Sequence, residues 1–207
     1  MVDLNKILIA GGHGMIGSHL DFGIKPSKAE FDVTNSKNIS EKCKQYNPSG
    51  ILCLSSINLR DSEQNPLEAY KVNTLGVYNL AKAAKKRKLP LILLSTGAVF
   101  SGRAEDSFSE ENIPNPKNIY GQTKYLAEII TLENSKKNLV VRTGWVFGAN
   151  KDSKKKGIFD KMLDLTIEGK EIKATYDQYG SPIYMKDLTS ELKKLISNNH
   201  SGIYHLT

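Results

Sequence analysis

Three side chains stand in an order and spacing that suit hydride transfer at a carbonyl group. Tyr120 and Lys124 are four residues apart, so on a helix they occupy one face, one turn apart. Reduction of a ketone by a dihydronicotinamide needs a proton for the ketone oxygen. A phenol can supply this proton when a neighbouring ammonium stabilises the phenolate. Thr96 ends an apolar run and could hydrogen-bond the same oxygen, so we predict Thr96, Tyr120 and Lys124 as catalytic residues.

A glycine turn near the N-terminus is the second chemical feature. Its glycines recur at three-residue spacing directly after the apolar run 7–10, where a Cβ would keep phosphate oxygens away from the backbone. We expect a helix to open at Met15 and to direct its positive end at those phosphates. The alternative is a glycine-rich turn without a ligand. The turn predicts NADP(H) or NAD(H) as cofactor, bound by Gly11, Gly14, Met15, Ile16 and Gly17.

The elements that must position these residues alternate along the chain. Strands are expected at 6–10, 50–54, 90–96, 138–142 and 202–206, and helices at 36–46, from 66 onward, around 120–124, at 158–167 and at 186–197. Such alternation predicts an α/β fold, a doubly wound parallel sheet of the Rossmann type, whose ligands bind beyond the carboxyl ends of the strands. We expect one NAD(P)-binding domain over residues 1–207, with residues of about 143–185 contributing a small substrate lobe.

The segment after the glycine turn is short for a dinucleotide-binding fold. Pro26 follows the turn closely, so the first helix must be brief. Lys28 could face a 2′-phosphate, which would favour NADP(H) over NAD(H). A solvated surface lysine is the alternative.

Bulk properties limit the classes of function. The chain has 207 residues, 39% of them hydrophobic and 25% charged, as in an ordinary globular protein with one sizeable core. No apolar run approaches the roughly 18 residues that span a bilayer, so a cytoplasmic protein without a membrane partner is expected. The net charge is +7, and its two densest basic clusters are the runs 85–88 and 154–156, which we interpret as solvated surface rather than a nucleic-acid site. The cysteines and histidines lack metal-site spacing, so no metal is expected.

The combined motifs resemble the extended short-chain dehydrogenase/reductases, and within them the dTDP-4-dehydrorhamnose reductases. The resemblance covers nearly the whole chain and rests on residues 11–17, 31–34, 72–73, 95–96 with 99–100, 120–124, 142–148, 177–182 and 202–205. It implies that Tyr120 is the proton donor and that Lys124 also binds the nicotinamide ribose.

The resemblance also implies further binding residues. Asp32 and Val33 would contact the adenine, and the strand end at Leu54 would pass beside the cofactor. Trp145 would lie in the sugar-nucleotide pocket; the alternative is that this lone tryptophan is a core residue. The implied cofactor-binding set beyond the glycine turn is Lys28, Asp32, Val33, Leu54, Ser55, Ser56, Asn73, Tyr120 and Lys124. The implied substrate-binding set is Thr96, Trp145 and Gln178.

Two departures from the family pattern keep several functions open. Gly97-Ala98 stands where these reductases usually have Asp-Tyr, and the sequence ends at Thr207, where the family continues. A reduced substrate lobe is therefore expected: either its pocket is open, a homodimer or a partner subunit completes it, or activity is lost. The leading interpretation is an NAD(P)H-dependent reductase of a nucleotide-linked 4-keto-6-deoxy sugar. The alternatives are an epimerase or dehydratase of the same family and a non-catalytic, nucleotide-binding regulatory homologue.

Overall fold

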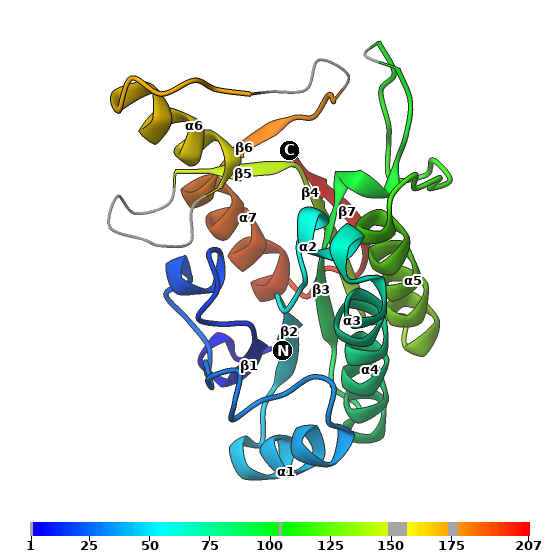
Figure 1. The fold of residues 1–207 in the computed structure, drawn as a ribbon. Helices are drawn as coiled ribbons and strands as arrows, with labels where there is room; N and C mark the ends of the chain where they lie inside the picture. The colour runs from blue at the N-terminus through cyan, green and yellow to red at the C-terminus, as the bar shows by residue number, and fades with distance from the viewer. Residues whose placement is uncertain (1, 104, 149–156, 174–177) are drawn as a thin grey trace.

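Parallel strands form the centre of the protein (Figure 1). This computed structural model describes residues 2–103, 105–148, 157–173 and 178–207. Within them the main sheet has the order β1 (Ile7–Ala10), β2 (Gly50–Cys53), β3 (Leu91–Thr96), β4 (Leu139–Thr143) and β7 (Gly202–Leu206). β1 to β4 are almost entirely buried, as strands covered on both faces require. All neighbours are parallel, so the carboxyl ends of the strands meet at one edge.

Helices cover both faces of this sheet, which confirms the doubly wound fold. One face packs against α1 (Ser36–Tyr46), α4 (Gly76–Arg87) and α5 (Ile119–Asn134). The other face packs against α7 (Met185–Ser197) and the apolar side chains of Leu20 and Phe22. Figure 1 shows α7 on one side of the sheet and α4 and α5 on the other.

The expected helix after the glycine turn is absent, and a single 3-10 turn, η2 (Gly17–His19), takes its place. The prediction of a helix dipole aimed at the phosphates was therefore wrong. The chain must return at once to form an isolated parallel bridge between Ile24 and Leu8. The Lys25 ammonium donates to Leu20 O at 2.5 Å and so holds the segment that runs back to β1. The residues between the glycine turn and this segment are too few for a regular helix.

The helix expected from residue 66 onward is also interrupted. It begins as α3 (Pro66–Ala69), continues as a π-helical turn, η3 (Tyr70–Leu75), and becomes regular again in α4. A shorter helix, α2 (Leu59–Gln64), precedes it. The π turn packs against α5.

A small lobe lies outside the main sheet. β5 (Trp145–Phe147) pairs in parallel with β6 (Pro182–Tyr184), and α6 (Ile158–Ile167) packs on β5. These elements occupy the segment predicted to form a substrate lobe. Two short 3-10 turns, η1 (Leu4–Lys6) and η4 (Gly97–Val99), complete the described elements. None of the described helices has the length and hydropathy of a membrane-spanning segment.

Candidate active site

The first turn of α5 carries Tyr120 and packs directly on the segment that follows Thr96. Asn118 caps the helix, its side-chain oxygen accepting from Gly121 N at 2.7 Å. A Cβ at Gly121 would collide with the carbonyl oxygen of Ala98. Glycine at this position therefore allows α5 to approach η4 closely, which brings Tyr120 to the carboxyl end of β3.

Thr96 is the last residue of β3 and is half-buried. Its hydroxyl oxygen accepts a hydrogen bond from Ala98 N at 3.1 Å and so caps η4. A hydroxyl that accepts one bond still has its own hydrogen to donate. Thr96 is thus held in place by its acceptor side while its O–H remains able to bind a substrate oxygen.

Lys124 lies one turn after Tyr120 and is 2% exposed. Its ammonium donates to the main-chain carbonyl of Leu94 at 2.6 Å, two residues before Thr96. An ammonium has three donors, so this contact leaves donors for a phenolate and a ribose. Burial raises the pKa of the Cys53 thiol, and the charge of Lys124 partly offsets that effect, which places the ammonium near the end of β2 as well.

The π turn η3 holds the residues between Tyr120 and Lys124. Tyr70 donates to Gln122 Oε1 at 3.1 Å, and the Thr74 hydroxyl donates to the carbonyl of Thr123 at 3.0 Å. Such π turns in α-helices often mark functional sites. No pattern in the sequence indicated this turn.

Asn73, an expected cofactor-binding residue, lies fully buried in the same π turn. Its side-chain oxygen accepts from Ile57 N at 2.7 Å, and its amide nitrogen donates to Ile57 O at 3.1 Å and to the Thr123 hydroxyl at 3.0 Å. The structure therefore shows Asn73 joining the loop after β2 to α5. Through that loop it shapes the edge where Leu54, Ser55 and Ser56 lie.

The glycine turn fits a diphosphate even without a helix behind it. Gly11 has φ +84°, and a Cβ there would lie 2.7 Å from Ser55 N, so the ends of β1 and β2 meet at this residue. Gly14 N donates to Gly11 O at 2.9 Å, which closes the turn. The main-chain N–H groups of Met15 and Ile16 have no partner among the described residues, so both are available to phosphate oxygens.

The predicted adenine end is built from loops. Asp32 Oδ1 accepts from Thr34 N at 2.9 Å and from the Thr34 hydroxyl at 2.8 Å. The Val33 side chain is buried against Gly76 of α4, and its carbonyl oxygen accepts from Asn79 Nδ2 at 3.1 Å, which leaves its main-chain N–H for a ligand contact. Lys28 is exposed and forms no ion pair within the described residues.

The small lobe brings Trp145 and the segment containing Gln178 together. The indole of Trp145 packs over Gly180, where a Cβ would lie 3.1 Å from Cε2, and its backbone nitrogen donates to Ser181 O at 3.0 Å. The indole is half-buried, with its ring centroid 5.8 Å from that of Phe159. Gln178 is exposed at the start of this segment.

The sheet links this lobe to the catalytic candidates, because Thr96 and Thr143 are register partners. Trp145 begins two residues beyond Thr143, where the chain leaves the main sheet. The predicted substrate residues and the predicted catalytic residues therefore share one edge of the sheet.

The model of the RmlD substrate binding domain family matches residues 5–207. The chain belongs to this family. A dTDP-4-dehydrorhamnose reductase of Aggregatibacter actinomycetemcomitans is 30% identical over 98% of this chain and 73% of that protein. The spore coat polysaccharide biosynthesis protein SpsK of Bacillus subtilis is 27% identical over 99% of this chain and 74% of that protein.

A solved structure gives the same result. The crystal structure of dTDP-4-dehydrorhamnose reductase from Bacillus anthracis in complex with NADP superposes with a TM-score of 0.87 at 29% identity, covering 100% of this chain and 76% of that one. These comparisons confirm the predicted family, the Rossmann-type fold, the class of NAD(P)-dependent oxidoreductase and the nicotinamide cofactor.

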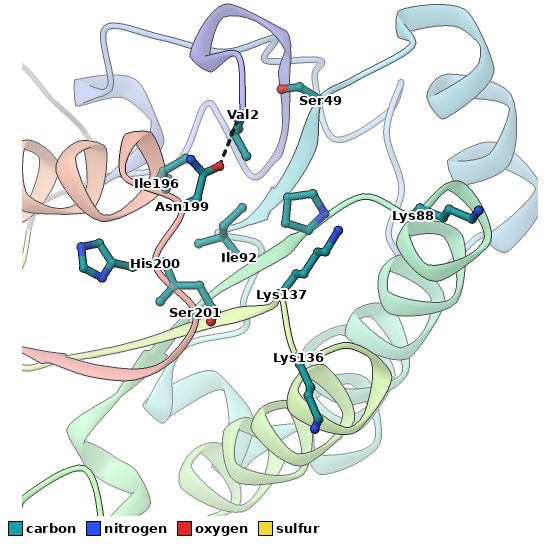
Figure 2. Close-up of a pocket in the computed structure, with 12 residues that line it drawn as sticks. Val2, Ser49, Lys88, Ile92, Lys136, Lys137, Ile196, Asn199, His200 and Ser201 are labelled. Carbon is teal, nitrogen blue, oxygen red and sulfur yellow. Dashed lines mark hydrogen bonds between the residues drawn. The ribbon is translucent and has the colours of Figure 1, made fainter.

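A cavity of about 500 Å³ lies elsewhere in this RmlD-family chain, at the amino ends of the strands (Figure 2). Ile92 and Leu139, which lie near the starts of β3 and β4, and Ile196 line it, with Lys136 and Lys137 at its rim. The predicted catalytic residues lie at the opposite ends of these strands. This cavity is therefore separate from the candidate active site.

Proposed function

We propose that the protein reduces a nucleotide-linked 4-keto-6-deoxy sugar to the 4-hydroxy sugar with NAD(P)H. The observation that carries the proposal is the bond from Lys124 to Leu94 O. It brings the ammonium, one helical turn after Tyr120, to the strand that ends in Thr96. The names of the relatives support a keto sugar as substrate.

The cofactor would be held by the residues around the ends of β1 and β2. The free N–H groups of Met15 and Ile16 bind the diphosphate, and Gly11 and Gly14 let it approach the backbone. Asp32 and the Val33 backbone contact the adenine, and Lys28 pairs with a 2′-phosphate when NADPH is bound. The reduced nicotinamide supplies a hydride.

The protein's own groups complete the reduction by moving a proton. Tyr120 donates its phenolic hydrogen to the carbonyl oxygen as that oxygen gains negative charge, and the Thr96 hydroxyl fixes the same oxygen by a hydrogen bond. Lys124 stabilises the resulting phenolate and binds the ribose. One hydride on carbon and one proton on oxygen convert the ketone to an alcohol.

The nucleotide sugar would lie between this edge and the small lobe. Trp145 offers a flat apolar surface for a base or a sugar ring, and exposed Gln178 offers an amide to its hydroxyl groups. The net charge of +7 favours the approach of an anionic nucleotide. A second subunit could complete this pocket.

An assay of cofactor oxidation tests the proposal. Purified protein is mixed with NADPH or NADH and a panel of nucleotide-linked 4-keto-6-deoxy sugars, including dTDP-linked ones. We expect one cofactor oxidised per sugar reduced. Product without net cofactor oxidation would indicate an epimerase, and cofactor binding without any product would indicate a binding protein. Either result would overturn the proposed reduction.

A further inference from the structure

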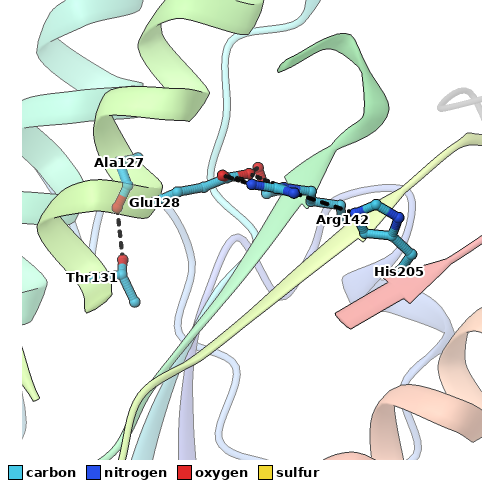
Figure 3. A network of polar contacts seen from close by, with 6 residues as sticks. Ala127, Glu128, Thr131, Arg142 and His205 are labelled. Carbon is cyan, nitrogen blue, oxygen red and sulfur yellow. Dashed lines mark hydrogen bonds and ion pairs between the residues drawn. The ribbon is translucent and has the colours of Figure 1, made fainter. Parts of the chain in front are cut away.

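A buried ion pair lies beneath the candidate active site (Figure 3). Arg142 of β4 donates from Nη2 to Glu128 Oε2 at 2.8 Å and from Nε to Oε1 and Oε2 at 3.1 and 3.2 Å. The two side chains are only 3% and 2% exposed. Both oxygens of the Glu128 carboxylate thus accept from the planar guanidinium of Arg142, which fixes the orientation of the two side chains relative to each other.

The same carboxylate also reaches the strand that carries Thr96. The hydroxyl of Ser95, the residue directly before Thr96 on β3, donates to Glu128 Oε1. Glu128 itself lies on α5 one turn after Lys124. One carboxylate therefore joins α5, β3 and β4, the first two of which carry all three predicted catalytic residues.

The far side of Arg142 holds the segment that follows Thr96. The guanidinium lies 4.9 Å from the ring centroid of Phe100, and Phe100 stacks on Phe108 with centroids 4.6 Å apart. Arg142 Nη1 is also 3.3 Å from Nε2 of His205 on β7. Arg142 thus connects the Glu128 carboxylate of α5 to the segment that follows Thr96 at the end of β3.

We propose that Glu128 and Arg142 are positioning residues that set the placement of Tyr120 and Lys124 relative to Thr96. The inference rests on the proposed function. A buried ion pair is a poor source of stability, because desolvation offsets most of the attraction and apolar residues of similar size often do as well. What apolar residues cannot supply is a directional link between three elements at once.

The first test is Glu128→Gln, which keeps the size of the side chain and removes its charge. We expect kcat to fall by roughly 10- to 100-fold, the range that a small misplacement of reacting groups produces. KM for NADPH should change less than kcat, because the glycine turn that holds the diphosphate is untouched and only the ribose contact of Lys124 is affected. The matched control is Glu191→Gln, which breaks an exposed ion pair of 2.6 Å with Lys194 on α7 and should leave both constants unchanged.

A second set of variants separates positioning from stability. Ser95→Ala removes the link to β3 and leaves the ion pair, so kcat should fall while the melting temperature changes little. The double variant Glu128→Met/Arg142→Met keeps the volume without the charges, and we expect it to fold with reduced kcat. The proposal would be overturned if the folded double variant had the kcat of the wild-type protein. It would also be overturned if Ser95→Ala did.

Hydrogen exchange separates failure of this inference from failure of the proposed function. If the wild-type protein oxidises no cofactor with any keto sugar, the reductase assignment fails, but amide exchange over residues 119–124 still tests positioning. Glu128→Gln should speed exchange in that turn by about tenfold relative to Glu191→Gln, with the β1 peptide unchanged. Equal exchange in the two variants would overturn the inference.

Discussion

The Lys124 ammonium lies 2.6 Å from the carbonyl oxygen of Leu94, so a buried charge on α5 is attached to the backbone of β3. This contact fixes the lysine beside the strand that ends in Thr96. Because the group is 2% exposed, water competes little for its remaining donors. A site built this way is preorganised, and less ordering is needed when a substrate binds.

Tyr120→Phe should reduce turnover by roughly 10²- to 10⁴-fold, the usual contribution of a positioned proton donor. The affinity for NADPH, measured by calorimetry, should stay nearly unchanged because the ring remains. Tyr125→Phe is the control, since it removes a phenol from the same helix at a position that does not face Lys124 at four-residue spacing. If turnover survives in Tyr120→Phe, the phenol is not the donor.

Gly14→Val should abolish NADPH binding. A Cβ at Gly14 would lie 3.0 Å from Gly11 O inside the closed turn, and a branched side chain would extend into the space where phosphate oxygens must approach. Gly169→Asn serves as the control, because a Cβ there meets nothing within 4 Å and asparagine tolerates the left-handed φ of +65° at this position. Equilibrium dialysis would contradict the prediction if Gly14→Val bound the cofactor as tightly as the control.

Asn73→Ala should lower the free energy of unfolding by about 1–3 kcal/mol, because it leaves the main-chain groups of Ile57 without their buried partner. Urea unfolding measures the change. The loop that carries Ser55 and Ser56 loses its attachment to α5, so NADPH affinity should fall as well. The control is Asn198→Ala, an exposed asparagine at the end of α7. Equal midpoints for both variants would mean that the Asn73 bonds contribute nothing.

The stability of the protein should fall as the pH drops from about 7.5 to about 5.5. Burial lowers the pKa of His205 below its ordinary value of 6.5, with Arg142 acting in the same direction and Glu110 and Glu128 opposing it. The unfolded chain therefore binds a proton at His205 before the folded protein does, and stability is lost as pH falls through this window. Glu110, whose pKa is lowered by the hydrogen bond from His205 N, loses its contribution only in more acidic solution.

His205→Gln should make that acid loss smaller, and His200→Gln should keep it, because His200 is an exposed ring outside the Arg142 network. Urea midpoints at the two pH values give the comparison. An identical loss in wild type and His205→Gln would assign the effect to other groups.

The sequence predicted those parts of the fold that depend on local pattern. The apolar runs of β1 to β4 lie within about two residues of their observed limits, and 36–46 and 158–167 match α1 and α6 at both ends. These segments are periodic and are bounded by turn residues, so neighbours in the chain suffice to define them. The Tyr120–Lys124 spacing was readable for the same reason.

The features that the sequence did not predict depend on contacts between distant segments. The π turn at Tyr70–Leu75 is tied to Gln122 and Thr123, which lie about fifty residues later. The replacement of the first helix by η2 depends on the bridge from Ile24 to Leu8. The Glu128–Arg142 pair could have been suspected only from an acidic residue one turn after Lys124 and a basic residue inside a buried strand.

The placement of Trp145 gives the protein a built-in optical reporter. It is the single tryptophan of the chain, and it lies in the small lobe over Gly180 rather than in the main core. Selective excitation of indole will therefore give emission from the lobe alone. The efficiency of energy transfer from Trp145 to a bound reduced nicotinamide will report the distance between the lobe and the cofactor. Cofactor binding can thus be followed in a stopped-flow instrument on the unlabelled chain.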